Sequence, residues 1–536
     1  MPLQQLEPRC PDDMDAWILG SGIASLTSAA HLIQEAQIPP SRVHIIERLE
    51  KAGGGSASTG DFVNGYDYHA GAIPAFNNVY MERLLSIVPS NSDPAKSALE
   101  DIREFNSTRP PHICPNTRFL SHKPSGLLRS SSERVRIGLR DRISLYRLSS
   151  KTEKGLGRSR IQDHFCSSFF QSSYWLTLAT TFGFEPSHSA AEFRRYVQWF
   201  RRGKHELNHL RPLDNGHYNR HESIIMPVAR FLQSNGVDFR FGTTIADIIL
   251  DEAHQRVCSI RTVKDNIPET AINVRANDIV IASLGSVISG ATSGTNTTPP
   301  SLEIICPEKD LDENWLLWLE LSTKDTKFGN AYNFCTRMSD SRQESFTVTL
   351  KSPKFFDLFT DLTGNAPGSG EFVTLKDSNW LLSLKIPYQP MFPDQPAGIQ
   401  VFWGYAVFPE HRGDYIKKPM LECSGEEIMT EILQHLQFPL EPILRDSITI
   451  PCVVPRMAAP FLPREHCDRP QVIPEGMTNL ALIGQFVDIP NEIAGTMDYY
   501  VKGAQIAVHH LMGLDQDTIQ PGYQFQHTHE ALTCSR

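Results

Sequence analysis

The stretch Ala16-Trp17-Ile18-Leu19-Gly20-Ser21-Gly22-Ile23-Ala24-Ser25 places a short apolar run directly before a glycine-rich turn. The next segment, SLTSAAHLIQEAQ at 25–37, repeats apolar residues at helical spacing, and VHIIE at 43–47 is a second apolar run. This order predicts a strand, a turn, a helix and a second strand, which together form a βαβ unit. Gly20 allows the tight turn, Gly22 lets the backbone approach a pyrophosphate, and the small Ser25 permits close helix–strand packing.

An acidic residue and a second glycine-rich loop follow this unit. Glu47 ends the second predicted strand, where a carboxylate meets a ribose hydroxyl in dinucleotide-binding proteins. The loop Gly53-Gly54-Gly55-Ser56 comes directly afterwards, as in flavoproteins where such a loop passes close to the cofactor. An acid at this position argues against a bound 2′-phosphate, so NADP is not expected as the sole cofactor.

A late apolar run, LALIG at 480–484, is followed by a predicted helix at 498–512. A C-terminal return of this kind to the first domain favours FAD over NAD. We therefore predict an α/β fold with a Rossmann-like FAD-binding domain. The residues expected to hold the cofactor are Gly20, Gly22, Ser25, Glu47, Gly54, Gly55, Ser56 and Gly484.

Composition sets outer limits on the function. The chain has 536 residues, of which 40% are hydrophobic, and a formal net charge of −10, so we expect two or more domains and no nucleic-acid partner. Its ten cysteines form no CxxC pair and no zinc-like cluster with histidine, so neither a metal nor a disulfide framework is expected. No apolar run reaches the length of a spanning helix and the first residues lack an apolar signal core, so we expect a cytoplasmic protein.

The rest of the chain predicts further parts. Residues 345–406 alternate like strands of an antiparallel sheet, and residues 165–202 are aromatic-rich with a helical pattern. The stretch 118–160 holds nine arginines, three lysines and few acids. We interpret it either as an ordinary amphipathic helix or as a basic surface for an anionic partner. The apolar residues of such a helix would be Leu139, Ile143, Tyr146 and Leu148. Peripheral membrane contact and a homodimer both stay open. The expected parts are a loose N-terminus (1–13), an FAD-binding part (14–115), a helical insertion (116–217), a return to the FAD domain (218–300), an antiparallel-sheet substrate domain (301–445), a C-terminal return with a helix (446–515) and a tail (516–536).

Several longer segments resemble one known family. They are GSGIASL at 20–26, VHIIE at 43–47, TTFGFEPSHSAAEFRRY at 180–196, YNRHES at 218–223, KKPMLECSGEEI at 417–428 and LALIGQF at 480–486. They are similar, in the same order, to segments of the oleate (fatty-acid) hydratases, also called the myosin-cross-reactive antigen family. The resemblance implies FAD, an antiparallel-sheet substrate domain and an enzyme that adds water to a carbon–carbon double bond of a fatty acid without net flavin redox.

The resemblance assigns catalytic roles, and one of them is lost. A tyrosine thought to protonate the alkene in the family corresponds to Tyr196. The glutamate that activates water corresponds to Ile73, whose side chain can neither hold nor deprotonate water. His69 is a candidate replacement base nearby in sequence. Hydration is therefore doubtful, and we expect isomerisation or cyclisation, as in a tailoring enzyme of secondary metabolism, or a non-catalytic flavin- or lipid-binding protein.

The substrate end also departs from the family pattern. Arg220 replaces a glutamine of the family, and Arg456 follows a segment that lacks the family's threonine–histidine pair. A guanidinium binds a carboxylate in bidentate fashion. Arg220 and Arg456 are therefore predicted to line the channel of an unsaturated carboxylic substrate, together with Ile73, although two surface arginines are the plainer interpretation.

Overall fold

The computed structural model describes residues 9–56, 58–68, 79–91, 93–108, 117–124, 126–130, 137–203, 216–265, 267–302, 311–368 and 372–514. A five-stranded parallel sheet, with strands from both halves of the chain, organises its first domain. Its strands are β1 (Ala16–Leu19), β2 (Val43–Ile46), β7 (Asp238–Arg240), β12 (Ile279–Ser283) and β19 (Leu480–Ile483), in the order β19-β12-β1-β2-β7. Parallel strands with helices on their faces are buried throughout, which explains the unbroken apolar runs. The predicted Rossmann-like α/β class is confirmed.

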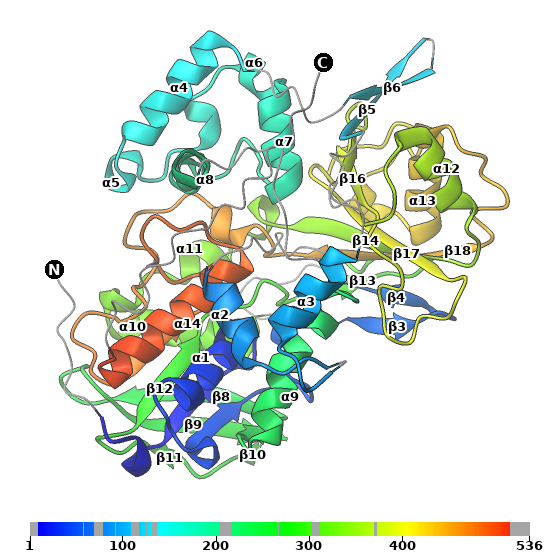
Figure 1. Cartoon of the computed structure of the whole chain (residues 1–536). Coiled ribbons are helices and arrows are strands. Elements are labelled where there is room, and N and C mark those ends of the chain that lie inside the picture. Colours follow the sequence, from blue (N-terminus) through cyan, green and yellow to red (C-terminus); the bar gives the residue numbers. More distant parts are fainter. Residues whose placement is uncertain are drawn as a thin grey trace.

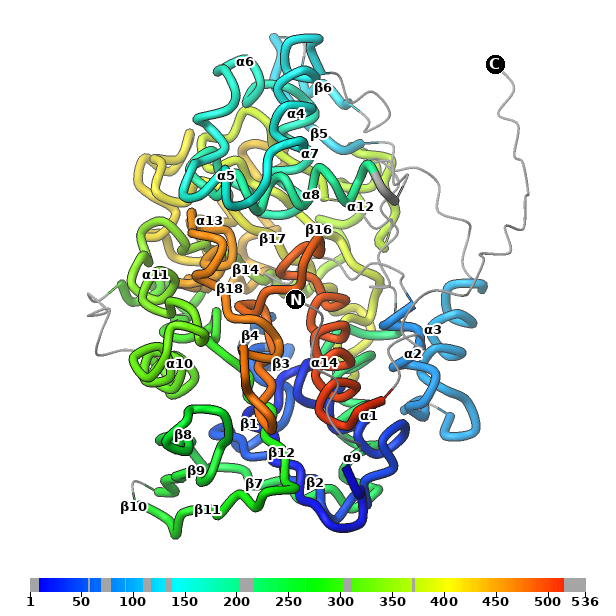
Figure 2. Tube along the Cα trace, turned by 90° about the vertical axis from the view of Figure 1, so that its left-hand side faces the viewer, coloured from blue at the N-terminus to red at the C-terminus, as the bar shows by residue number. Residues whose placement is uncertain are grey.

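Helices from both ends of the chain cover this sheet. Helix α1 (Ile23–Gln34) packs against α14 (Met497–Met512) and α9 (Met226–Ser234), and the views show α14 beside α1 (Figures 1 and 2). Helices α2 (Val79–Ile87) and α3 (Ala98–Ser107) lie next to them. The segment at 9–13, expected to be loose, is anchored, because the Arg9 guanidinium donates hydrogen bonds to the carbonyls of Leu511, Asn277 and Thr478.

A small antiparallel sheet extends from this domain. It comprises β8 (Thr243–Leu250), β9 (Val257–Lys264), β10 (Ile267–Pro268) and β11 (Ile272–Asn273), and α10 (Glu313–Lys324) packs on β8. A short helix, α11 (Tyr332–Cys335), leads from there towards the second large sheet.

The expected antiparallel sheet is present as an eight-stranded sheet in the order β13-β18-β14-β17-β16-β15-β5-β6, whose strand pairs are antiparallel except for β15 and β5. Their bounds are β13 (Thr292–Ser293), β18 (Ser447–Val454), β14 (Gln343–Leu350), β17 (Gln400–Ala406), β16 (Leu382–Lys385), β15 (Val373–Leu375), β5 (Phe119–Lys123) and β6 (Gly126–Ser130). Helices α12 (Lys354–Thr363) and α13 (Gly425–Leu436) share a hydrophobic core with one face. The hairpin of β3 (Thr59–Asp61) and β4 (Gly65–Asp67) meets the sheet, where the backbone N–H groups of Tyr66 and Tyr68 donate to the hydroxyls of Thr349 and Thr347.

A helical unit lies beside the eight-stranded sheet, at the end of the molecule opposite the small β8–β11 sheet (Figure 1). It contains α4 (Leu139–Ser150), α5 (Glu153–Leu156), α6 (Ser167–Phe170), α7 (Ser173–Phe182) and α8 (Ala190–Gly203) around an aromatic core. The predicted helix near 139–148 is present as α4, but the expectation for its buried face is wrong. Leu148 is buried with Asp141 and Ser149, whereas Leu139, Ile143 and Tyr146 are exposed. Strands β5 and β6 were not expected from the sequence; they form a hairpin that joins the sheet through β5, whose partner β15 lies far along the chain.

Two further properties bear on function. All seven cysteines in the described part of the chain are free thiols. Within the described ranges, no helix is both long enough and apolar enough to cross a membrane.

Candidate functional site

The glycine-rich turn between β1 and α1 opens onto a large cavity. Gly22 caps the N-terminus of α1, and a Cβ atom built on it would meet no atom within 4 Å. Gly20 adopts a φ of +98°, a conformation that favours glycine. The first turn of a helix has backbone N–H groups without helical partners, which attract anions. The empty space above Gly22 therefore lies where a pyrophosphate would bind.

Glu47 joins the second strand to this turn. One carboxylate oxygen accepts hydrogen bonds from the backbone N–H of Ser21 at 2.8 Å and from its hydroxyl at 2.7 Å. The other oxygen accepts from the backbone N–H of Leu49 at 2.8 Å. The carboxylate therefore holds the turn in shape and also lines the cavity.

Two other glycine segments complete the cavity wall. The backbone N–H of Gly53 donates to the carbonyl of Ser21 at 3.0 Å, and a Cβ on Gly54 would lie 3.3 Å from the Cα of Gly22. Gly484 follows β19 with a φ of +103°. Gly54, Gly55 and Gly484 line a cavity of about 1670 Å³, its open mouth included, together with Gly20, Gly22 and Glu47.

Ser25, one of the two predicted serines, does not line this cavity. Ser25 is fully buried, and its hydroxyl lies 3.7 Å from where a Cβ on Gly20 would stand. This placement suits a packing role for a small side chain rather than direct contact with a ligand. Ser56 ends the short helix Gly54–Ser56, and its side chain lies outside what the structure describes.

A smaller cavity adjoins the large one. Tyr68 and Arg220 line both cavities, so these two residues mark the junction. The smaller cavity, about 530 Å³ with its mouth, is also lined by Lys385, Tyr388 and other residues. Arg220 therefore faces space that continues to the glycine-rich turn. Lys385 ends strand β16 and is 8% exposed, and a cation at this place was not anticipated from the sequence.

His221 is a second residue that sequence reasoning missed. It begins a single turn of π-helix, His221–Ile225, directly after Arg220, and it lines the large cavity. Gly53 makes room for the ring, because a Cβ there would lie 2.9 Å from His221 Cε1. Its buried Nδ1 has no hydrogen-bond partner among the described residues. Burial, with a smaller contribution from Lys51, lowers the pKa of His221, so the neutral ring is favoured.

Tyr196 lies behind the cavity wall rather than in it. Its ring packs edge-on against Phe182 and Phe461, two residues that line the large cavity. Its buried hydroxyl donates a hydrogen bond to the carbonyl of Ala494 at 2.9 Å. Burial, followed by the nearby Glu192, raises the pKa of Tyr196 well above its ordinary value. By contrast, Tyr500 lines the cavity itself and donates to the Gln485 side chain at 3.0 Å.

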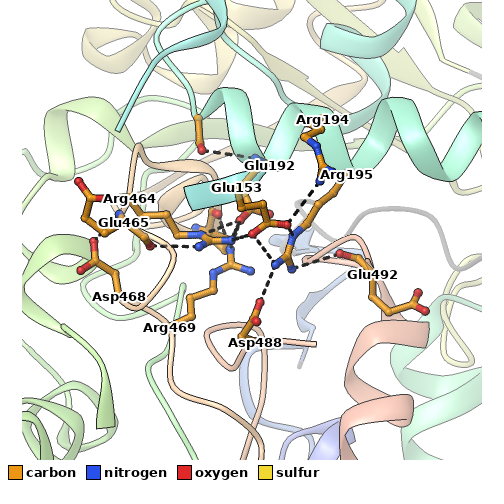
Figure 3. Close-up of polar contacts among 12 residues, drawn as sticks. Glu153, Glu192, Arg194, Arg195, Arg464, Glu465, Asp468, Arg469, Asp488 and Glu492 are labelled. Carbon is orange, nitrogen blue, oxygen red and sulfur yellow. Dashed lines mark hydrogen bonds and ion pairs between the residues drawn. The ribbon is translucent and has the colours of Figure 1, made fainter. Parts of the chain in front are cut away.

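A buried ionic network fixes the helix that carries Tyr196 (Figure 3). Arg195 contacts Glu153 at 2.7 Å and Asp488 at 2.6 Å. Arg464 contacts Glu192 at 2.7 Å, and neither side chain is exposed. Burial alone would raise the pKa of Glu192, but Arg469, Arg464 and Arg195 outweigh it and lower the pKa to about 2. The network therefore ties α8 to the returning segment around residues 464–492.

The remaining predicted site residues lie elsewhere or cannot be placed. Arg456 is fully buried, and its guanidinium donates to the carbonyls of Cys335 and Ser289, both at 2.9 Å. It lines neither cavity described above, so this placement does not support its predicted role at the substrate. His69 and Ile73 lie outside the described residues, and their roles stay predictions.

One group of side chains in the described part of the chain has ligand atoms close enough for a metal ion, namely Asp414, Glu431 and His435. Both oxygens of Glu431 already accept hydrogen bonds from backbone N–H groups of residues 414–416. None of the three residues lines either cavity. The group stabilises a loop and takes no part in the site.

The sequence model of the MCRA family matches residues 13–509 of the chain. The chain is 30% identical over 518 residues to an oleate hydratase from Streptococcus pyogenes serotype M49 (strain NZ131), covering 94% of this chain and 86% of that protein. It is 26% identical over 549 residues to a linoleate hydratase from Lactiplantibacillus plantarum, covering 94% of each. Among solved structures, cyclohexylamine oxidase from Brevibacterium oxydans IH-35A is similar to this chain with a TM-score of 0.53 and 12% sequence identity. The match covers 95% of this chain and all of that one, so the two proteins share a fold.

Proposed function

The chain belongs to the MCRA family, as its sequence motifs indicated, and we propose on this basis that it is an FAD-binding enzyme acting on a carbon–carbon double bond of an unsaturated carboxylic acid. The observation that carries this proposal is the junction of the two cavities. The large cavity has the walls expected for a dinucleotide, and it continues at Tyr68 and Arg220 into a smaller cavity with two cationic side chains. A cofactor and an anionic substrate can therefore bind next to each other.

The fit of FAD rests on the shape of the glycine segments. Gly22 leaves open space at the N-terminus of α1, and Gly54 passes close beside it. Glu47 is placed at the end of β2, where a ribose hydroxyl would lie. When bound, FAD supplies a rigid surface that helps to shape the reaction site without net redox, as the family resemblance implies.

The substrate carboxylate is assigned to the smaller cavity. Arg220 and Lys385 both line it, and charge-assisted hydrogen bonds from such groups are stronger than those from neutral amides. The hydrocarbon chain then runs past Tyr68 towards the large cavity. This direction brings a double bond into the cavity that His221 lines.

The reaction is assigned as double-bond isomerisation or ring closure rather than hydration. The family's water-activating glutamate corresponds to Ile73 in this sequence, so a water on that face would lack a base. In isomerisation, a tyrosine hydroxyl gives its proton to one alkene carbon, and a base removes a proton from the carbon beside the cation. The double bond moves by one position, and the tyrosine regains a proton from the protonated base.

His221 is the described residue best suited to accept that proton. Its ring lines the cavity, and the lowered pKa keeps it neutral near pH 7. Tyr196 is the proton donor that the family resemblance indicates, whereas Tyr500 is the tyrosine whose side chain lines the cavity. The two assignments can be separated by experiment.

The test is incubation of FAD-loaded protein with unsaturated fatty acids and with a metabolite extract, followed by mass spectrometry. An isomeric product supports the proposal, a product heavier by one water would restore hydration, and no product would leave a binding protein. Tyr196→Phe and Tyr500→Phe are compared as a matched pair, because each loses one hydroxyl and keeps its ring. His221→Gln should remove most product while FAD content is retained; wild-type turnover in this variant would exclude His221.

A further inference from the structure

Helix α4 presents apolar side chains to solvent. Leu139 is 74% exposed, Tyr146 66% and Ile143 46%, and at helical spacing these three residues form one stripe. The opposite face buries Leu148, Ser149 and Asp141. The helix therefore packs inward through Leu148 and the partly buried Leu145, yet it also turns a leucine, an isoleucine and a tyrosine outward, where a surface helix usually carries polar side chains.

Basic side chains flank the stripe on both sides. Arg140 and Arg147 follow one edge and Arg142 the other, and all three are exposed. In the part of the chain that the structure describes, none of the three forms an ion pair. Residues 118–160 contain nine arginines and three lysines against three acids, within a chain whose net charge is −10. The positive charge is therefore local and set against an acidic background.

The position of α4 leaves this face accessible. In both views α4 and strand β6 lie at the end of the molecule opposite the small β8–β11 sheet (Figures 1 and 2). Strand β6 adds Leu128, 42% exposed, and the exposed Arg129 at the same end. Apolar and basic side chains thus recur there on two elements.

We propose that this outer face of α4, defined by Leu139, Arg140, Arg142, Ile143, Tyr146 and Arg147, docks the protein onto an anionic lipid surface. An apolar stripe edged by arginines suits a helix lying in the plane of the interface, with the stripe inserted and the guanidiniums at the lipid phosphates. The tyrosine suits the boundary, because its ring is apolar and its hydroxyl polar. The surface charge selects anionic over zwitterionic lipid. This inference does not depend on the proposed reaction.

The test is co-sedimentation of the full-length protein with vesicles of phosphatidylcholine alone or mixed with phosphatidylglycerol. We expect binding only to the mixed vesicles, and weakening as salt is raised. An apolar variant (Leu139→Glu with Ile143→Glu) and a charge variant (Arg140→Gln, Arg142→Gln and Arg147→Gln) should each lower vesicle partitioning by at least about tenfold. The matched control is Ile267→Glu on β10, an apolar residue at the opposite end whose exposure (68%) lies between those of Leu139 and Ile143, and this variant should bind as wild type.

Circular dichroism and thermal unfolding establish that each variant is folded before it is compared. Equal binding to phosphatidylcholine alone would overturn the proposal, as would wild-type binding by both α4 variants. Size-exclusion chromatography adds one more outcome. If the wild type binds no vesicle and forms a dimer that the apolar variant disrupts, the face is an interface between two copies and the proposal fails.

Discussion

Replacing Gly22 with valine tests the cofactor site with little effect on the fold. Gly22 has a φ of −66° and a ψ of 171°, which valine adopts without strain, and a Cβ at this position meets no atom within 4 Å. The cost to the fold is the loss of a favourable residue type at a helix N-cap, roughly 0.5–1 kcal/mol. The side chain would, however, occupy the space into which a pyrophosphate must fit.

The chain offers a closely matched control at Gly138. This residue also caps a helix N-terminus, with a φ of −65° and a ψ of 156°, and a Cβ there would lie 3.4 Å from one Asp141 oxygen. Gly138 lines neither cavity. Both valine variants should therefore lose a similar small amount of stability, and only the Gly22→Val protein should lose the cofactor.

The assay measures flavin absorbance per protein after purification and the Kd of added FAD, with denaturant unfolding as the measure of stability. We expect Gly22→Val to weaken FAD at least about tenfold, or ~1.4 kcal/mol, and Gly138→Val to bind as wild type. Equal flavin content in both variants would refute the assignment of the cavity. Loss of flavin in both would trace the effect to stability instead.

Three further predictions follow from the buried charges. Lys385→Met should weaken binding of an unsaturated fatty acid about tenfold in calorimetry and leave binding of its methyl ester unaffected, because the proposed contact of Lys385 with the ligand is through the carboxylate alone; equal losses for both ligands would place Lys385 outside the substrate site. Burial, followed by the nearby Glu410, raises the pKa of Glu185 from its ordinary value of 4.5 to about 8. Between these two pH values the folded state keeps a proton that the unfolded chain has released, so the free energy of unfolding falls as the pH rises. Glu185→Gln should remove this slope, up to about 1.4 kcal/mol per pH unit, in urea unfolding across pH 5–8, and an unchanged slope would show that another group is responsible. Arg464→Leu should cost about 3 kcal/mol because it leaves Glu192 short of a partner, and adding Glu192→Leu should restore much of it; a double variant as unstable as the single one would contradict this account.

Local signals in the sequence predicted much of the parallel sheet and the cofactor cavity. Each of these signals, namely the βαβ unit, Glu47 and the LALIG strand, can be recognised from a few consecutive residues. The structure places Glu47 and the glycines of both segments around one cavity. The roles of these residues towards FAD stay predictions.

The remainder depends on contacts between distant parts of the chain. Lys385 lines a cavity only because β16 pairs with β17 in one register, and a shift by one residue would turn its side chain to the other face. Arg456 is buried by carbonyls of residues more than a hundred positions away, which no local pattern indicates. The outward apolar face of α4 follows the helical period, but the period alone does not say which face packs inward.

The order of strands in the parallel sheet has a consequence for how the chain folds during synthesis. Strand β1 is made first and needs β12 beside it, and β12 in turn needs β19, made some 200 residues later. Helix α1 likewise acquires its partner α14 only when residues 497–512 have left the ribosome. Until then, the apolar faces of β12 and α1 have no complete partner, and exposed apolar surface of this kind makes an incomplete chain prone to aggregate. Folding of the first domain is therefore completed by the last part of the described chain to be translated.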